Sequence, residues 1–187
     1  MSGDDDQLFA VLDDLERRAA AAFAAEREWE IADVARADYA SVSLASRLMA
    51  SLGSPVLIDV RGLGPLSGTL THLGPDWLLL GAPRTSWLVL TAAVMTVSGA
   101  SPRSRHEDSW ELRHRLGVRA VLDRLCEQGS ALLVHLEDGT RRHLVLRRIG
   151  ADFVEAVERE ATEQEHSILL ASRMIAAIRL DSTTELA

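Results

Sequence analysis

The sequence predicts an α+β protein in which an N-terminal helical arm precedes two tandem units, each a helix followed by a five-stranded β-barrel. Three observations support this fold class. Residues 4–52 contain neither proline nor glycine. The hydrophobic pattern then changes from helical spacing to alternation at Gly53, and the alternating part recurs about 76 residues later. We therefore expect an arm over 1–41, a first unit over 42–102, and a linker, helix and second barrel over 103–187.

The arm is predicted to be helical and to carry a stripe of apolar side chains. Asp4, Asp5 and Asp6 place acidic charge where a helix N-terminus favours it. An uninterrupted helix of this length would measure about 70 Å, which one compact domain cannot cover. We expect either a hairpin bend near residues 30–40 or contact between the first helix and another subunit. The predicted self-association stripe has coiled-coil spacing and consists of Leu8, Leu12, Leu15, Ala19 and Ala22.

The first unit begins with a second helical pattern, from Val42 to Leu52, which Gly53 ends. Apolar residues then alternate with polar ones or gather in short runs between turns, which is typical of strands. Gly68 lies inside one of them and indicates a sharp bend. Closure of five short strands into a small barrel would remove exposed edges. The strands are expected over 56–60, 66–73, 77–80, 86–90 and 94–97.

The second unit repeats this layout. Gly129-Ser130 corresponds to Gly53-Ser54, and a helical pattern precedes each of these pairs. Trp77 and Phe153 follow equivalent turns, so both are expected in barrel cores rather than as base-stacking platforms. Internal repetition over a long period is a stronger signal of architecture than a single motif.

The segment from Val56 to Leu80 resembles the Sm-like fold, including bacterial Hfq. It has an alternating strand, a turn, Gly68-Thr69-Leu70, a second turn and an apolar strand. SH3-like barrels share much of this pattern, and tandem units behind a helical arm resemble a group of uncharacterised actinobacterial proteins. The resemblance covers residues 42–100 and, more loosely, 115–180. It implies a strongly bent barrel, whereas Leu78 stands where Sm proteins carry a base-reading asparagine.

Charge is unevenly distributed along the chain, which has 28 acidic and 20 basic residues and a formal net charge of −8. Every basic residue is arginine, and residues 51–150 hold 12 arginines against 9 acids. Exposed arginines could contact nucleic-acid phosphates. The glutamates that follow, from Glu155 to Glu165, are expected in a solvated loop and could pair with these arginines instead, which is the preferred interpretation. The candidate nucleic-acid-binding residues are Arg141, Arg142, Arg147 and Arg148.

No catalytic, metal or cofactor site is predicted. His106 and His114 are eight residues apart, not the four that let two ligands on one helix face a zinc ion, and both are expected on the surface. The glycine-rich turn around Gly62 joins two strands, whereas a dinucleotide loop opens a helix. The single cysteine, Cys126, is interpreted as a small buried side chain.

The preferred functional hypothesis is a non-catalytic interaction or regulatory module that self-associates or binds a protein partner. The alternative is RNA or DNA binding through the arginine-bearing hairpin of the second unit, and an enzyme ranks third. The acidic N-terminus has no signal-peptide pattern, and the longest apolar runs, such as 77–80, are too short to span a bilayer. We therefore expect a cytoplasmic protein without membrane contact.

Overall fold

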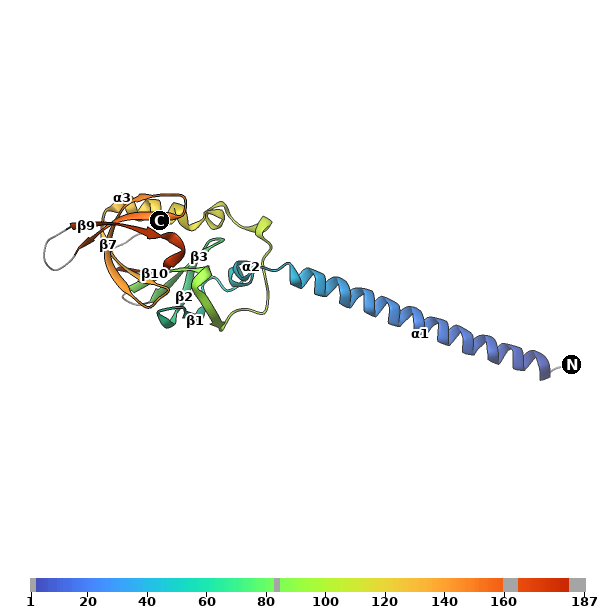
Figure 1. Ribbon diagram of the computed structural model, residues 1–187. Helices are drawn as coiled ribbons and strands as arrows, with labels where there is room; N and C mark the ends of the chain where they lie inside the picture. Colours follow the sequence, from blue (N-terminus) through green and yellow to red (C-terminus); the bar gives the residue numbers. More distant parts are fainter. Residues whose placement is uncertain (1–2, 83–84, 160–164, 182–187) are drawn as a thin grey trace. The chain divides into compact units, whose positions relative to one another are not determined.

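The computed structural model describes residues 3–82, 85–159 and 165–181 (Figure 1). It contains two compact units, Met1–Val42 and Ser43–Ala187. The first unit is helical and the second holds the sheet. The two predicted barrel segments, 42–102 and 103–187, thus pack together within one compact unit, apart from the boundary residue Val42.

The first unit is one uninterrupted helix, α1 (Gly3–Ala40), so the chain forms no hairpin near residues 30–40. Its continuity follows from the absence of proline and glycine between residues 4 and 52. The helix ends where the amide of Ser41 donates to the carbonyl of Asp38. The backbone of the predicted stripe belongs to α1, but its side chains lie outside the described residues, namely Leu8, Leu12, Leu15, Ala19 and Ala22.

The second unit opens with α2 (Leu44–Met49), which is capped by Ser43 because its hydroxyl accepts a hydrogen bond from the Ser46 amide at 3.0 Å. The five strands expected in the first half are all present within two residues of their predicted bounds. They are β1 (Pro55–Val60), β2 (Gly64–Leu73), β3 (Trp77–Ala82), β4 (Thr85–Leu90) and β5 (Val94–Ser98), with the short helix η1 (Thr91–Ala93) before β5.

The second half follows a linker that contains the short helices η2 (Glu107–Ser109) and η3 (Leu112–Arg115). A longer helix then precedes five strands, as the repeat predicts. These elements are α3 (Val118–Gln128), β6 (Ala131–Leu136), β7 (Arg141–Ile149), β8 (Phe153–Arg159), β9 (Glu165–Ala171), η4 (Ser172–Met174) and β10 (Ile175–Asp181).

The two halves share their local geometry residue by residue. The amide of Gly74 donates to the carbonyl of Trp77 at 2.9 Å, and Gly150 donates to Phe153 at 2.8 Å. The β2–β3 pair has a bulge after Leu70, and the β7–β8 pair has one at the equivalent position, after Leu146. These matches define which residue of one half corresponds to which residue of the other.

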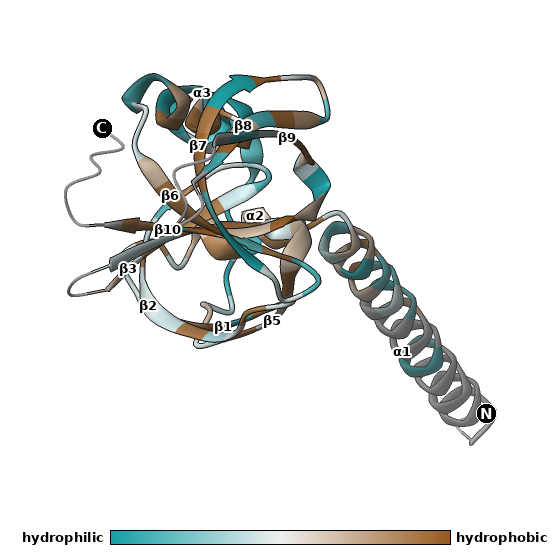
Figure 2. Cartoon of the chain, turned by 60° about the vertical axis from the view of Figure 1, so that its left-hand side comes forward, coloured by the Kyte–Doolittle hydropathy of each residue, from teal (hydrophilic) through white to brown (hydrophobic). Residues whose placement is uncertain are grey.

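The strands form one antiparallel ten-stranded sheet in the order β5-β1-β2-β3-β4-β10-β6-β7-β8-β9. Each half therefore has the same internal order, and the pairing of β4 with β10 joins the halves. We expected two separate barrels closed on themselves. Within the described ranges the sheet is continuous and open, and its end strands are β5 and β9. The halves merge because β4 and β10 pair antiparallel, and β10 also pairs with β6 within the second half (Figure 2 shows β10 beside β6).

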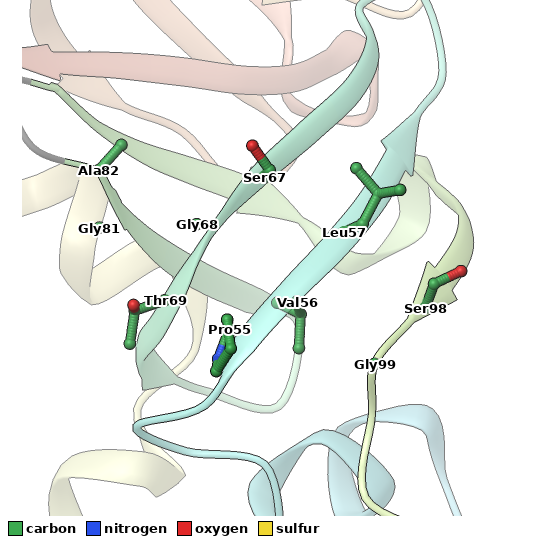
Figure 3. A pocket seen from close by; sticks show the side chains of 10 residues that line it. All are labelled: Pro55, Val56, Leu57, Ser67, Gly68, Thr69, Gly81, Ala82, Ser98 and Gly99. Carbon is green, nitrogen blue, oxygen red and sulfur yellow. The ribbon is translucent and has the colours of Figure 1, made fainter.

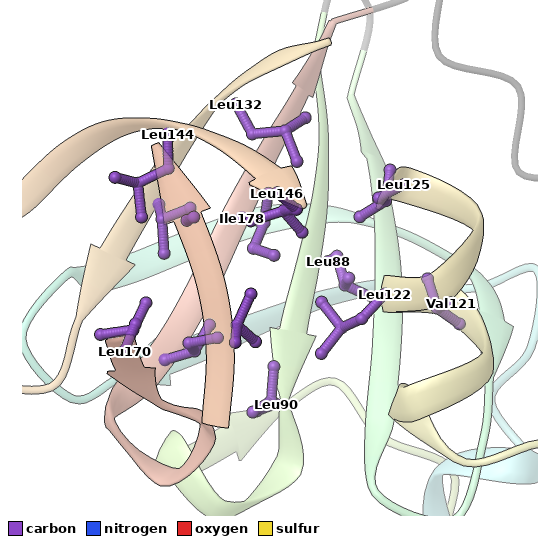
Figure 4. Packing of buried hydrophobic residues seen from close by; sticks show 14 of the residues in the cluster. Leu88, Leu90, Val121, Leu122, Leu125, Leu132, Leu144, Leu146, Leu170 and Ile178 are labelled. Atoms are coloured by element: carbon purple, nitrogen blue, oxygen red, sulfur yellow. The ribbon is translucent and has the colours of Figure 1, made fainter. Parts of the chain in front are cut away.

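The hydrophobic core consists of two clusters, and each draws side chains from both halves. Leu122 and Leu125 of α3 pack in one cluster with Leu88 and Leu90 of β4 (Figure 4). The other cluster surrounds Ile58 and includes two alanines of β10. Each cluster is therefore completed across the β4–β10 pairing.

Candidate interaction site

The predicted arginine hairpin lies on β7, where all four arginines are exposed. Arg142 donates to both carboxylate oxygens of Glu158 on β8, at 2.7 and 2.9 Å. Arg148 makes a two-pronged pair with Glu155 at 2.9 and 3.2 Å. These hydrogen bonds and the charge of Glu155 raise the pKa of Arg148. The preferred interpretation, an ion-paired face, is confirmed for these two arginines.

The sequence predicted one solvated loop for the glutamates from Glu155 to Glu165, and this prediction is wrong for Glu155 and Glu158. Glu155 and Glu158 belong to β8, and their side chains are only 26% and 18% exposed beneath the paired arginines. Glu160 and Glu163 lie outside the described residues. For Arg141 and Arg147, the described part of the chain shows no ion pair, so these two remain the exposed cationic candidates.

Two residues expected elsewhere have different positions in the structure. His114, expected at the surface, is 7% exposed, and its Nδ1 lies 2.7 Å from the carbonyl oxygen of Leu73. Phe153, expected in the core, is 38% exposed, whereas the equivalent Trp77 is buried and donates from Nε1 to the carbonyl of Leu116 at 2.8 Å. Trp77 gains its cover from the linker that precedes α3. Among the described residues, Phe153 has no equivalent hydrogen-bonded cover and stays 38% exposed.

The remaining chemical candidates show no arrangement for catalysis. Burial and the carboxylate of Asp123 raise the pKa of Cys126, which keeps its thiol protonated at neutral pH. His106 is exposed and lies 3.2 Å from Asp108. Among residues 3–82, 85–159 and 165–181, no three or more His, Cys, Asp or Glu side chains are grouped to hold a metal ion.

The glycine-rich turn between β1 and β2 is a packing contact between the halves. Gly62 has a φ of +73°, and a Cβ placed on it would lie 2.4 Å from the carbonyl oxygen of Leu136. Next to it, Arg61 pairs with Glu137 at 3.0 Å. The turn therefore needs glycine both for its backbone conformation and for the close approach of the second half.

A hollow of about 530 Å³ lies over β1 and β2 and reaches the end of β5 (Figure 3). Small or apolar side chains and backbone line it, with no titratable group among them. Gly68 is one of its walls, and a Cβ there would lie 2.8 Å from the carbonyl oxygen of Gly81. The hollow offers shape but no acid, base or nucleophile.

The seam between the halves is the β4–β10 pairing, defined by five residue pairs from Ala177↔Val89 to Asp181↔Thr85. Leu88 lies opposite Ile178 in this ladder, and both side chains are fully buried. His135 of β6 also packs at the seam, with its ring centroid 5.3 Å from that of Trp87 on β4. His135 is 8% exposed, and the sequence-based predictions did not include its burial.

The two end strands are the counterparts of the seam strands, and within residues 3–82, 85–159 and 165–181 no strand pairs with their outer sides. Leu169 of β9 is equivalent to Leu88, because each lies opposite the equivalent residue of the preceding strand. Leu88 is fully buried, whereas Leu169 is 71% exposed. On β5, Met95 is equivalent to the fully buried Ala176 and is 50% exposed. The sequence alone gave no signal to separate these end strands from the seam strands.

A second hollow, of about 360 Å³, lies beside β5, between that strand and α2. Its walls are mainly apolar and include Leu44, Leu48 and Val97. One charged side chain, that of Arg47, also lines the hollow, so β5 is flanked by a recess that is apolar apart from this arginine and Thr96.

Comparison of the chain with known protein families and with curated proteins found no match. In the described part of the chain, no helix combines the length and the apolar character needed to cross a membrane.

Proposed function

We propose that this protein is a non-catalytic interaction module that self-associates and is built on two tandem Sm-like units. The observation that carries the proposal is the seam. The two equivalent halves of the sheet are joined by the pairing of β4 with β10. The outer end strands, β9 and β5, are the counterparts of these two strands. Unpaired strand edges with apolar side chains favour association with another strand.

The exposed apolar side chains of the end strands support this proposal over a monomeric role. Leu169 and Met95 are large, exposed and uncharged at positions whose equivalents are buried. Proteins usually protect an end strand with charge, proline or a covering segment. β5 contains no charged residue and no proline, so neither of these protections is present within it.

The nucleic-acid alternative rests on Arg141 and Arg147, which are exposed on β7. It is less well supported because Arg142 and Arg148 are already paired with glutamates and the whole chain is acidic. Fluorescence anisotropy with labelled single-stranded RNA and DNA, titrated with salt, tests it. Saturable, salt-sensitive binding that weakens in an Arg141→Ala/Arg147→Ala variant would support it, and absence of binding at micromolar protein would exclude these residues.

Self-association is tested by sedimentation velocity on the purified protein over a hundredfold range of concentration. The protomer mass is 20.4 kDa. We expect the weight-average mass to rise above this value as the concentration increases. A mass that stays at one protomer throughout the range contradicts the proposed function.

A further inference from the structure

We propose that β9 of one copy pairs antiparallel with β5 of a second copy, in the register that the internal seam defines. This inference rests on the proposed self-association and identifies its surface. The partner is a second copy of this chain, because β9 and β5 are the counterparts of β4 and β10, which already pair with each other. The template for this contact is present within the molecule, where β4 pairs with β10.

The register follows from the equivalence of the two halves. β9 and β4 have the same pairing to their preceding strands: Leu169 lies opposite Glu155, as Leu88 lies opposite Leu79. β5 and β10 likewise have the same pairing to β1 and β6, including a shift at the same place. Transferring the seam register to the end strands sets Leu170 opposite Thr96, Leu169 opposite Val97 and Ile168 opposite Ser98.

Leu169 is the central side chain of this contact. In the seam, the equivalent Leu88 lies opposite Ile178 and joins the core cluster that includes residues of α3. The corresponding helix beside β5 is α2, and a hollow of about 360 Å³ lies between them, with Leu44 and Leu48 among its apolar walls and Arg47 as its charged residue. We infer that Leu169 of one copy packs against Val97 and this hollow of the next copy.

The end strands differ from the seam strands in one respect that affects strength. β5 ends at Ser98, and the following Gly99 has a φ of +84°, so the ladder we expect has three pairs rather than the five of the seam. A shorter ladder makes the contact weaker and dependent on concentration. Each added copy exposes a new β5 and a new β9, so the assembly is head-to-tail.

The first test is Leu169→Arg, with Leu112→Arg as the matched control. Both leucines are highly exposed in a single copy, at 71% and 79%, so neither substitution should unfold the protomer, which circular dichroism checks. We expect Leu169→Arg to raise the dissociation constant by about tenfold or more, since it removes a buried leucine from the contact. Leu112→Arg should leave it unchanged.

The second test detects the register by disulfide formation, in a Cys126→Ser background that removes the native thiol. A Ser98→Cys chain is mixed with an Ile168→Cys chain and oxidised. Opposed residues of an antiparallel pair point to the same face at a spacing that a disulfide can bridge. We expect a covalent dimer in the mixture and little from either chain alone. The control chain carries Ser167→Cys, which is one residue out of register and on the opposite face.

The outcomes separate this inference from the proposed function. Association that weakens in Leu169→Arg, with the register-specific disulfide, supports the inference. Association that persists unchanged in Leu169→Arg, without that disulfide, overturns the β9–β5 pairing while self-association through another surface stands. A protein that stays monomeric at every concentration overturns both.

Discussion

The seam strands and the end strands of the sheet have similar apolar patterns but different environments. Leu88 and Leu169 occupy equivalent positions, yet one is fully buried and the other is 71% exposed. The difference comes only from what lies beside each strand. β4 has β10 as its neighbour, whereas no strand of the described part of the chain lies on the outer side of β9. The comparison shows that the burial of this leucine position depends on the half that lies next along the sheet. It also indicates that a further copy would bind at β9.

The largest effect should come from the paired substitutions Leu88→Ala and Leu169→Ala. Leu88→Ala removes a fully buried side chain at the seam and should lower the free energy of unfolding by about 3–5 kcal/mol. Leu169→Ala should change it by less than about 0.5 kcal/mol in the monomer, because the side chain is exposed. Urea denaturation at low protein concentration measures both, and equal effects would contradict the distinction between the strands.

A smaller effect is expected from Gly62→Ala at the contact between the halves. The added Cβ would clash with the backbone of Leu136, and alanine is also unfavourable in the left-handed backbone conformation of this position. We therefore expect the free energy of unfolding to fall by about 2–4 kcal/mol. Gly64→Ala is the matched control, since its φ is +88° but nothing lies within 4 Å of the added carbon. Gly64→Ala should lower the free energy of unfolding by about 1 kcal/mol. A Gly62→Ala variant no less stable than Gly64→Ala would show that the turn does not pack against the second half.

The buried histidine at the seam should make stability depend on pH. Burial lowers the pKa of His135, and the charges of Arg141 and Arg179 lower it further. Its Nε2 finds no hydrogen-bond partner among the described residues. Below pH 6.5, the ordinary pKa of histidine, the unfolded chain therefore binds more protons than the folded one, so this contribution to stability is complete above that pH and is lost as the pH falls.

Replacing His135 with phenylalanine isolates this contribution. The slope of unfolding free energy against pH, measured from pH 7.5 to 5, should become shallower than in the wild type. The pKa of His72 is also lowered, first by burial, so His72→Gln is needed as a companion variant to separate the two contributions. An unchanged slope in His135→Phe would show that the seam does not sense the protonation of this ring.

The smallest effect should come from the ion pairs of β7. Arg142→Ala breaks a partly exposed pair with Glu158 and should reduce stability by about 1 kcal/mol or less. Arg141→Ala, the neighbouring exposed arginine, should have no measurable effect. Thermal unfolding at low and high salt compares the two, and the Arg142→Ala difference should shrink as salt increases. A larger loss of stability for Arg141→Ala than for Arg142→Ala would contradict the assignment of the ion pair to Arg142.

Local periodicity and turn residues were enough to predict the helices and strands that precede and form the sheet. The five strands of the first half fall within two residues of their expected bounds, because each is a short apolar segment between Gly-containing or polar turns. The arrangement of the halves was not accessible in the same way. Nothing in Ser167-Ile168-Leu169-Leu170 distinguishes an open edge from a seam, because the alternation reports which face is apolar and not which strand lies alongside.

The same limit explains the individual residues that were placed incorrectly. His114 is buried because the linker brings it beside the carbonyl of Leu73, a contact between residues 41 positions apart. Trp77 is less exposed than Phe153 because the linker before α3 covers it, with the carbonyl of Leu116 accepting from its Nε1. Both outcomes depend on tertiary neighbours, which a single-chain pattern does not encode.

Hydrogen exchange of the strand amides, followed as a function of protein concentration, tests the central claim most directly. Amides of β4 and β10 should be protected equally at every concentration, because their pairing is internal. Amides of Thr96–Ser98 and Ile168–Leu170 should exchange more slowly as the concentration rises, because they become paired between copies. Exchange in β5 and β9 that stays independent of concentration, under conditions where the protein associates, would contradict the account.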